Sequence, residues 1–314
     1  MRKINYPNTL MRNRFVIAAA AVVFFAAMAV SVFVSIYTDN TDELKESTRG
    51  LFCAHFIDVG QGNACLLSDP DGKFMLIDAG DNENSNYLVK YLKNFDVEKI
   101  EYLVITHPHE DHYGGARDVI RNFDVEKLVL YKEYKDTYPY DVLSYVLEER
   151  NENSQTVLAD FGDKYTFGKA EFEIISPENP DLTNYNDSSL ALRVKYGDTA
   201  FLFTGDAGKN MESAMINSDC ELKSDVFCAG HHGSSSSNSL KFLKIVNPDF
   251  IVVSCAKDNE YGHPHKESVK NFGKIGATVL ETGKNGDIVF SSDGKNVKLL
   301  AMRKNPLDQE TSER

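Results

Sequence analysis

The chain has 314 residues, with 34 Lys and Arg against 47 Asp and Glu, so its formal net charge is -13. A content of 42% hydrophobic and 26% charged residues is typical of a globular protein and excludes a disordered, collagenous or disulfide-framework chain. The acidic balance argues against a protein that grips nucleic acid with a basic face, because phosphate binding rests mainly on Lys and Arg. A bound metal ion can nevertheless make the local charge of an acidic protein positive.

The first segment with a clear pattern is a long apolar stretch. Residues 15–37 contain no charged side chain, and a helix of this length covers the roughly 30 Å hydrocarbon core of a bilayer. Basic side chains in residues 1–14 precede it and acidic ones follow it, so the positive-inside rule places the N-terminus in the cytoplasm. We therefore predict a single-pass signal anchor in the cell membrane with an extracellular domain; the alternative is secretion after cleavage near Ala27 or Ala29.

Residues 38–50 are polar and are predicted to be a linker, after which strand-like and helix-like segments alternate. Short runs rich in Val, Ile, Leu and Phe predict strands at 53–59, 64–69, 73–80, 101–107, 127–131, 171–177, 190–196, 199–206, 225–230, 250–255, 278–282, 287–292 and 296–301. Apolar residues at helical spacing predict helices at 86–95, 116–123, 141–150, 209–217, 240–246 and 267–274. This content predicts one α/β or α+β domain with layered sheets over 51–302, followed by a flexible tail at 303–314.

Seven of the eight histidines fall in three short stretches. They are His107, His109 and His112 in THPHEDHYGG, His231 and His232 in AGHHGSSSS, and His263 and His265 in YGHPHK. The first stretch follows an apolar strand and ends in two glycines, which predicts a loop leading into a helix. Two imidazoles spaced by one residue, followed by an adjacent Asp and His, can offer one pair of ligands to each of two cations. Imidazole with carboxylate suits Zn, Mn or Fe better than Mg or Ca.

Seven motifs along the chain together carry a family resemblance. They are FIDVGQGNACLL at 56–67, LIDAGD at 76–81, the HxHxDH run, NDSSLALRVKYG at 186–197, FLFTGD at 201–206, the HHGS run and SCAKDNEYGHPH at 254–265. With them, the sequence resembles the metallo-β-lactamase superfamily of metal-dependent hydrolases, and within it the extracellular hydrolase domain of ComEC-type competence proteins. The resemblance covers about residues 51–290 and implies a four-layer αββα sandwich, here behind the single N-terminal transmembrane helix.

The resemblance also implies a ligand set for two divalent metal ions, Zn or Mn. The implied ligands are His107 and His109 for the first metal, Asp111 and His112 for the second, Asp206 as the bridge, and one of His231 and His232 to complete the second site. Asp78 would orient a ligand histidine from behind. Many superfamily members place a further histidine roughly 20 residues before the bridging Asp, a region that here reads NYNDSS. Either the first metal has one ligand fewer, or Asp187 substitutes.

The reaction implied is attack by a hydroxide held between the two metals, with no side-chain nucleophile. We expect Asp111, His232 and His263 to act in catalysis, His263 as a phosphate contact or general acid, with a turn histidine as the alternative for His263. The substrate contacts expected are Asn186, Ser189 and Ser234. The Ser234–Ser237 run is interpreted as the cap of the helix that begins near Leu240.

The leading function from the resemblance is a phosphodiesterase or nuclease acting on DNA, with a DNA-uptake channel as a possible partner, because one span cannot itself translocate DNA. Residues 1–50 hold six basic and four acidic side chains, so the remainder has 28 and 43, a net charge of -15. That charge keeps three alternatives open. They are a phosphodiesterase for small or cell-wall phosphodiesters of the phosphorylcholine or teichoic-acid type, a lactonase-type hydrolase, and a non-catalytic binding module.

Overall fold

The structure, a computed structural model, describes residues 41–132, 143–149, 154–175, 180 and 183–303. The predicted N-terminus at 1–14 and the predicted membrane anchor at 15–37 lie outside these residues, as does the predicted tail from residue 304 onward. Among the helices that the structure describes, none combines the length and the apolar character that a membrane crossing requires.

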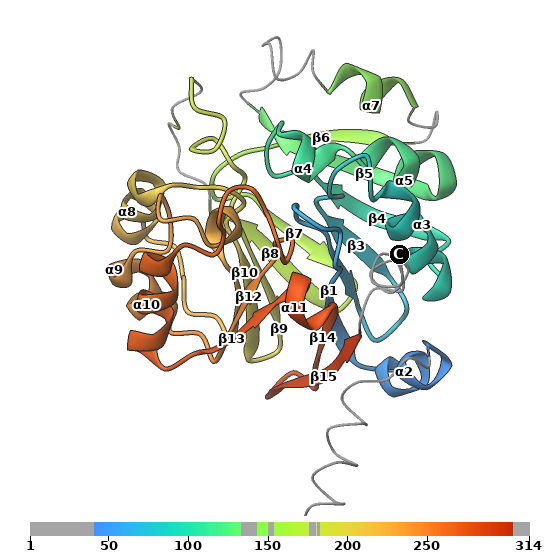
Figure 1. Cartoon of the computed structure of the whole chain (residues 1–314). Helices are drawn as coiled ribbons and strands as arrows, with labels where there is room; N and C mark the ends of the chain where they lie inside the picture. The colour runs from blue at the N-terminus through green and yellow to red at the C-terminus, as the bar shows by residue number, and fades with distance from the viewer. Residues whose placement is uncertain (1–40, 133–142, 150–153, 176–179, 181–182, 304–314) are drawn as a thin grey trace, which may run out of the picture.

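The strands and helices alternate along most of the chain (Figure 1). The strands are β1 (Phe52–Phe56), β2 (Cys65–Ser68), β3 (Phe74–Ile77), β4 (Lys99–Val104), β5 (Asp124–Tyr131), β6 (Gln155–Ala159), β7 (Lys164–Phe167), β8 (Ala170–Ile174), β9 (Leu192–Tyr196), β10 (Thr199–Phe203), β11 (Val226–Cys228), β12 (Phe250–Val253), β13 (Thr278–Glu281), β14 (Asp287–Ser292) and β15 (Val297–Arg303). The helices are α2 (Thr41–Thr48), α3 (Ser85–Asn94), α4 (Glu110–Tyr113), α5 (Ala116–Asn122), α7 (Ser144–Glu149), α8 (Lys209–Asn217), the 3-10 turn η2 (Gly230–Gly233), α9 (Leu240–Val246), α10 (Lys266–Ile275) and α11 (Thr282–Asn285).

The described strands form two mixed sheets. One has the order β15-β14-β1-β2-β3-β4-β5-β6 and the other the order β13-β12-β11-β10-β9-β8-β7. Strands β3 to β6 run parallel in the first sheet, and β10 to β13 run parallel in the second. The central parallel strands β10 and β11 are buried at every position because both faces of the sheet are covered there, so their sequences are continuous apolar runs.

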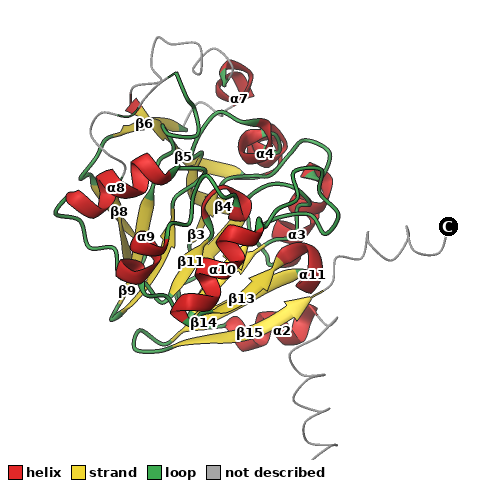
Figure 2. Cartoon of the chain, turned by 60° about the vertical axis from the view of Figure 1, so that its left-hand side comes forward, coloured by secondary structure: helices red, strands yellow, loops and turns green. Residues whose placement is uncertain are grey.

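Three hydrophobic clusters define the layers. The first, which includes Phe52, Phe172 and Phe201, lies between the two sheets. The second joins the outer face of the first sheet to α3 and α5, and the third joins the second sheet to α8, α9 and α10. Figure 1 shows these helix layers on opposite sides of the sheets, and in Figure 2 α9 and α10 lie in front of β11 and β13. The described residues thus form the four-layer αββα sandwich expected from the sequence.

The structure adds elements that the sequence pattern did not predict. Strands β6 and β7 were missed because most of their side chains are partly or fully exposed, so neither has a continuous apolar run. Residues 41–48, within the predicted linker, form the helix α2, whose Leu44 is only 2% exposed and packs into the second cluster. A single buried leucine among polar residues gives no periodic signal, so only tertiary packing identifies this helix. Of the helix predicted at 141–150, residues 144–149 are described and are helical.

Candidate metal centre

The predicted site residues converge at the carboxyl ends of the parallel strands of both sheets. Asp78 follows β3, the histidine run from His107 follows β4, Asp206 follows β10, and His231 with His232 follows β11. In α/β folds ligands bind at this edge, because the loops that leave several strands meet there. The two sheets face each other, so the loops of the first sheet, which carry Asp78 and the histidine run, meet the loops of the second, which carry Asp206 and the second histidine pair.

The backbone of the histidine run is held by hydrogen bonds from the loops that follow β1 and β3. The amide of Asn63 donates to the Asp111 carbonyl at 3.0 Å, and the amide of Ala79 donates to the His112 carbonyl at 2.7 Å. A Cβ atom at Gly62 would lie 2.5 Å from the Asp111 carbonyl oxygen, closer than real contacts allow. Glycine is therefore required in this loop for the backbones to approach, which gives the DVGQGN motif a structural role.

The side chains form two groups whose donor atoms could each hold a metal ion. One group is His107, His109 and Asp206; the other is Asp111, His112 and His232. Within each group, the candidate ligand atoms all lie within 4.8 Å of one another. Asp206 connects the groups, with Oδ2 at 3.7 Å from His107 Nε2 and Oδ1 at 3.1 Å from His112 Nε2. The first of these groups is called cluster 1 and the second cluster 2.

The contacts inside the clusters fit bound cations. His112 Nδ1 donates to Asp78 Oδ2 at 2.7 Å, so a neutral ring carries a lone pair on Nε2. That Nε2 faces Asp206 Oδ1, and both atoms are buried without a hydrogen-bond partner. Two lone pairs at 3.1 Å need a proton or a cation between them. Nε2 of His232, whose Nδ1 donates to a backbone carbonyl, lies 3.1 Å from Asp111 Oδ2, a hydrogen-bonding distance that also requires a proton or a cation between the two atoms. Imidazole and carboxylate donors of this kind suit divalent transition metals, and the choice of Zn or Mn stays a prediction.

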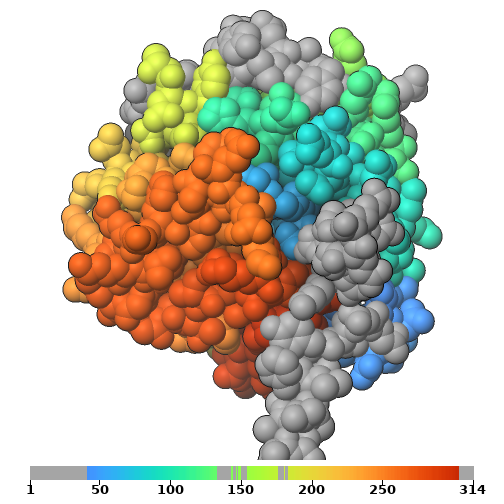
Figure 3. Space-filling view, in the orientation of Figure 1, coloured from blue at the N-terminus to red at the C-terminus, as the bar shows by residue number. Residues whose placement is uncertain are grey.

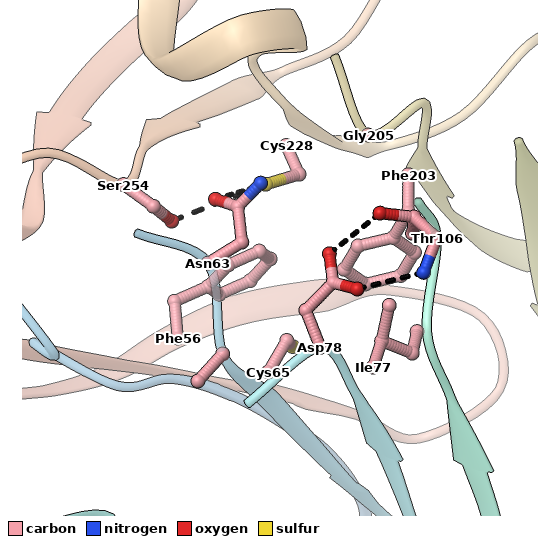
Figure 4. A pocket seen from close by; sticks show the side chains of 11 residues that line it. Phe56, Asn63, Cys65, Ile77, Asp78, Thr106, Phe203, Gly205, Cys228 and Ser254 are labelled. Carbon is pink, nitrogen blue, oxygen red and sulfur yellow. Dashed lines mark hydrogen bonds between the residues drawn. The ribbon is translucent and has the colours of Figure 1, made fainter. Parts of the chain in front are cut away.

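Asp78 supports the histidine run, as expected, and does so through Thr106. Asp78 has a left-handed backbone with φ 57°, and its carboxylate accepts from the amide and the hydroxyl of Thr106 at 2.8 and 2.9 Å. The Thr106 hydroxyl lies 3.2 Å from His107 Nδ1, so one carboxylate fixes a ring in each cluster. Figure 4 shows Asp78 and Thr106 beside a cavity of about 10 Å³ that Asn63, Cys228 and Ser254 also line.

The sequence left open which of His231 and His232 completes the second site. In the structure His232 lies with Asp111 and His112 in cluster 2. Its Nδ1 donates to the Ser254 carbonyl at 2.8 Å, and its ring is only 1% exposed. His231 instead turns Nε2 toward Asp206 Oδ2 at 3.5 Å, on the cluster 1 side, while its Nδ1 lies 3.2 Å from the Ser236 hydroxyl. Both histidines have left-handed backbones, with φ 51° and 52°, a strained conformation that is concentrated at functional sites.

Charges inside the centre shift the pKa values of its residues in opposite directions. Burial lowers the pKa of His107 well below its usual range, and the neighbouring His112 adds to this. Burial also acts against the charged form of His112, but the carboxylates of Asp206 and Asp78 outweigh it and raise the pKa of that ring. In turn, burial acts against ionised Asp206, yet the imidazoles of His112 and His232 hold its pKa well below the usual range. Protons and cations compete for these atoms, so cation binding weakens in acid.

The segment without the additional histidine supports Asp206 instead of supplying a ligand. The Ser189 hydroxyl accepts from the Asp206 amide at 3.0 Å and donates to the Asn186 carbonyl at 2.8 Å, and Ser189 is buried. The predicted substitute ligand, Asp187, lies outside both clusters and accepts from the Gly208 amide at 2.9 Å. The side-chain carbonyl oxygen of Asn186 is buried without a hydrogen-bond partner.

The serine run has a different role from the one expected. Ser239, beyond the run, caps α9 by accepting from the Phe242 amide at 3.3 Å, so the prediction that Ser234–Ser237 supplies this cap was wrong. Ser234, predicted to contact substrate, is buried and its hydroxyl accepts from the Ser236 amide and hydroxyl. The reason is that the run turns back over His231 before the helix begins.

His263 lies at the rim of the centre. Its ring centroid is 5.6 Å from that of His231 and 6.0 Å from that of His232, and its Nδ1 is buried without a partner. Burial and the nearby imidazole of His232 lower the pKa of His263 to about 4, so the ring is neutral near pH 7. A neutral ring fits a hydrogen-bonding contact with a substrate better than proton donation. Roles for Thr106, Ser254 and Ser236 were not predicted, because a hydroxyl or a backbone carbonyl beside a histidine motif gives no distinct sequence signal.

The sequence and fold have relatives among known proteins. The model of the metallo-beta-lactamase superfamily matches residues 57–256. The chain is 29% identical over 252 residues to ComE operon protein 3 of Bacillus subtilis, covering 74% of this chain and 32% of that protein. It is 28% identical over 249 residues to the competence protein ComA of Neisseria gonorrhoeae, covering 78% of this chain and 33% of that protein. The chain thus spans about a third of the length of these relatives.

A solved structure shows the same fold. The metallo hydrolase Igni18 from the archaeon Ignicoccus hospitalis superimposes with a TM-score of 0.51 at 18% identity, covering 77% of this chain and 100% of that one. With the family model spanning most of the domain and the expected ligands gathered at the carboxyl edge of both sheets, the chain belongs to the metallo-β-lactamase superfamily of metal-dependent hydrolases.

Proposed function

We propose that the chain is a membrane-anchored, extracellular phosphodiesterase that holds two divalent cations and acts on DNA. The observation that carries the proposal is the pair of donor clusters joined by Asp206, where His112 Nε2 and Asp206 Oδ1 face each other, buried and without a hydrogen-bond partner. Bound there, two divalent cations activate water and neutralise charge on the attacked phosphoryl oxygens. A phosphodiester, with two oxygens to share between cations, matches such a pair.

The residues of the chain position these cations and the substrate. In this proposal, Asp206 would serve both cations. Asp78 and the Ser254 carbonyl fix the rings of His112 and His232, so that each Nε2 points inward. His231 and His263 lie at the opening, where the partly exposed ring of His263 would contact a phosphoryl oxygen. Asp111 would keep its carboxylate for the second cation. No side-chain nucleophile is needed.

The similarity to a competence protein supports DNA as the substrate and a DNA-uptake channel as the partner. The apolar stretch at 15–37, with basic residues before it and acidic ones after it, supports the anchor and the extracellular placement. Under this proposal the domain would degrade or trim DNA at the cell surface while a separate protein carries the strand inward.

A second candidate follows from the charge. A domain with net charge -15 repels a long polyanion, whereas a small or cell-wall phosphodiester meets far less repulsion. Both candidate functions use the same clusters; they differ only in the groups of the substrate that flank the phosphate to be cleaved.

A substrate panel tests the proposal. The full chain loaded with Mn²⁺ or Zn²⁺ is incubated with single- and double-stranded DNA, bis(p-nitrophenyl) phosphate, p-nitrophenylphosphorylcholine and a lactone. We expect cleavage of DNA and of the small diesters, lost on chelation and in Asp206→Ala. Cleavage of small diesters without DNA would favour the second candidate. Hydrolysis of the lactone alone, or of nothing, would contradict a phosphodiesterase.

A further inference from the structure

The loop between β12 and α10 presents an aromatic ring to solvent beside the metal centre. Tyr261 is 66% exposed, more than any other large hydrophobic side chain in the part of the chain that the structure describes. Single exposed aromatic side chains are common on protein surfaces, so the exposure of Tyr261 has meaning only together with its place beside the metal centre. In the space-filling view of Figure 3, the orange segment that contains this loop reaches the surface beside the blue segment around residue 60. The hydrogen bond from the Ala256 amide to Gln61 joins the same two segments.

The Tyr261 ring is the outermost of three nearly parallel rings that lead to cluster 2. It lies 5.6 Å from the ring of His263, centroid to centroid, with 20° between their planes. His263 in turn lies 6.0 Å from His232, with 26° between planes. The inner ring of this series is a candidate metal ligand, so Tyr261 lies two ring spacings, of 5.6 and 6.0 Å, from the side chain beside which a phosphate would be held.

The loop that carries Tyr261 is fixed by hydrogen bonds. The side chain of Asn259 accepts from the His263 amide at 2.8 Å and donates to the His263 carbonyl at 2.7 Å. His265 accepts from the Ser235 amide through Nδ1 at 2.9 Å, so its Nε2 donates to the Tyr261 carbonyl at 3.1 Å. These bonds tie the tyrosine to the turn that bears His231 and His232. A ring on such a loop is preorganised, so a ligand that stacks on it has little order to impose.

We propose that Tyr261 is a stacking platform for a nucleobase next to the scissile phosphate, which makes single-stranded nucleic acid the substrate class; this rests on the proposed phosphodiesterase. The exposed charged residues that flank Tyr261 in the sequence, from 257 to 266, are balanced, with Lys257 and Lys266 against Asp258 and Glu260. An acidic domain gains little from phosphate neutralisation, so its affinity for nucleic acid must come from contacts that do not depend on charge. Stacking of a base on an aromatic ring is such a contact and tolerates any sequence.

The test compares two strands that differ only in their bases. The Mn²⁺-loaded full chain cleaves a single-stranded oligodeoxynucleotide and an abasic oligomer of the same length, and kcat and KM are measured for each. Tyr261→Ala should lower kcat/KM on the base-containing strand about tenfold, mainly through KM, with a much smaller loss on the abasic strand. Tyr261→Phe, which keeps the ring, should retain most of the wild-type value. The matched control Ile245→Ala, an exposed apolar residue on α9, should match wild type on both strands.

Each other outcome has a defined meaning. Equal losses of Tyr261→Ala on both strands, or no loss on either, would overturn the stacking role while the phosphodiesterase stands. The same holds if Tyr261→Phe fails as Tyr261→Ala does, because the hydroxyl would then be the contact. A greater loss on p-nitrophenylphosphorylcholine than on the base-containing strand would show that the ring binds a quaternary ammonium group and would overturn the nucleobase. If the wild-type chain cleaves none of these diesters, the proposed function itself fails.

Discussion

The two donor clusters share Asp206 but are built with unequal support. In cluster 2, His112 is held by the Asp78 carboxylate and His232 by a backbone carbonyl, and both rings are buried. In cluster 1, His107 is held by the Thr106 hydroxyl at 3.2 Å, and His109 is half-buried with its Nδ1 3.0 Å from His107 Nε2. The segment that often adds a histidine to cluster 1 supplies Ser189 to the Asp206 backbone instead. Because oriented ligands bind metal more tightly, cluster 2 should hold its ion more firmly than cluster 1.

The largest expected effect comes from removing the residue that the clusters share. Asp206→Ala deletes the bridge and should lower the hydrolysis rate on the order of a thousandfold, the loss of several kcal/mol of transition-state stabilisation. Elemental analysis should show a loss of bound metal, while circular dichroism stays close to wild type. The control is Asp198→Ala, an exposed carboxylate in the turn between β9 and β10. If Asp206→Ala kept both ions and full activity, Asp206 would not be the residue that joins the two clusters.

A buried carboxyl group outside both clusters shows how burial changes a pKa when no histidine offsets it. Burial raises the pKa of Asp287 to about 7, although its oxygens accept from the Asp58 amide and the Tyr87 hydroxyl. Between the unfolded pKa near 4 and the folded value near 7, the folded state holds more protons, so the free energy of unfolding falls as pH rises and levels off above 7. Asp287→Asn should remove this decline, a gain on the order of 4 kcal/mol at pH 8.

Chemical denaturation of the Asp287→Asn variant and wild type at pH 4 to 9 measures this difference. The variant should keep the metal content of wild type, because position 287 takes no part in either cluster. A difference between the two proteins that does not change with pH would contradict a raised pKa at this position.

The support of cluster 2 can be weakened without removing a ligand. Asp78→Asn keeps a residue that tolerates the left-handed backbone but removes the charge facing His112, so the cluster 2 ion should bind about 10- to 100-fold more weakly. Competition with a chromogenic chelator measures the affinity. Asp96→Asn, the same substitution at a left-handed position away from the centre, is the matched control. An equal effect of the two substitutions would show that Asp78 does not orient the ligand.

The smallest effect is expected at the rim. Ser236→Ala removes the hydroxyl beside His231 Nδ1 and should reduce kcat/KM only a few-fold, because the contact is exposed and 3.2 Å long. Steady-state kinetics on bis(p-nitrophenyl) phosphate provides the readout, with Ser213→Ala on α8 as control. If Ser236→Ala lowered kcat/KM as much as Asp78→Asn does in the same assay, the contact at the rim would be as important for the reaction as the support of cluster 2.

The sequence predicted the chemistry of the centre better than its support. The ligand types in the HxHxDH run are indicated by their spacing after an apolar strand, whereas Asp206 was identified through the family resemblance; both were named before the loops were placed. The partners that orient them, such as the Thr106 hydroxyl and the Ser254 carbonyl, depend on how two sheets meet and have no signal in a single sequence. Likewise, α2 is stabilised by the burial of Leu44, and its polar sequence resembles a linker.

The central claim is that the chain holds two divalent cations with unequal firmness. Elemental analysis of the purified full chain along a chelator titration tests it most directly. We predict two ions per chain that leave in two steps, and a single ion, leaving only in the later step, for His109→Ala, which damages cluster 1. One shared step for both ions, or a chain that hydrolyses phosphodiesters after all metal is removed, would contradict it.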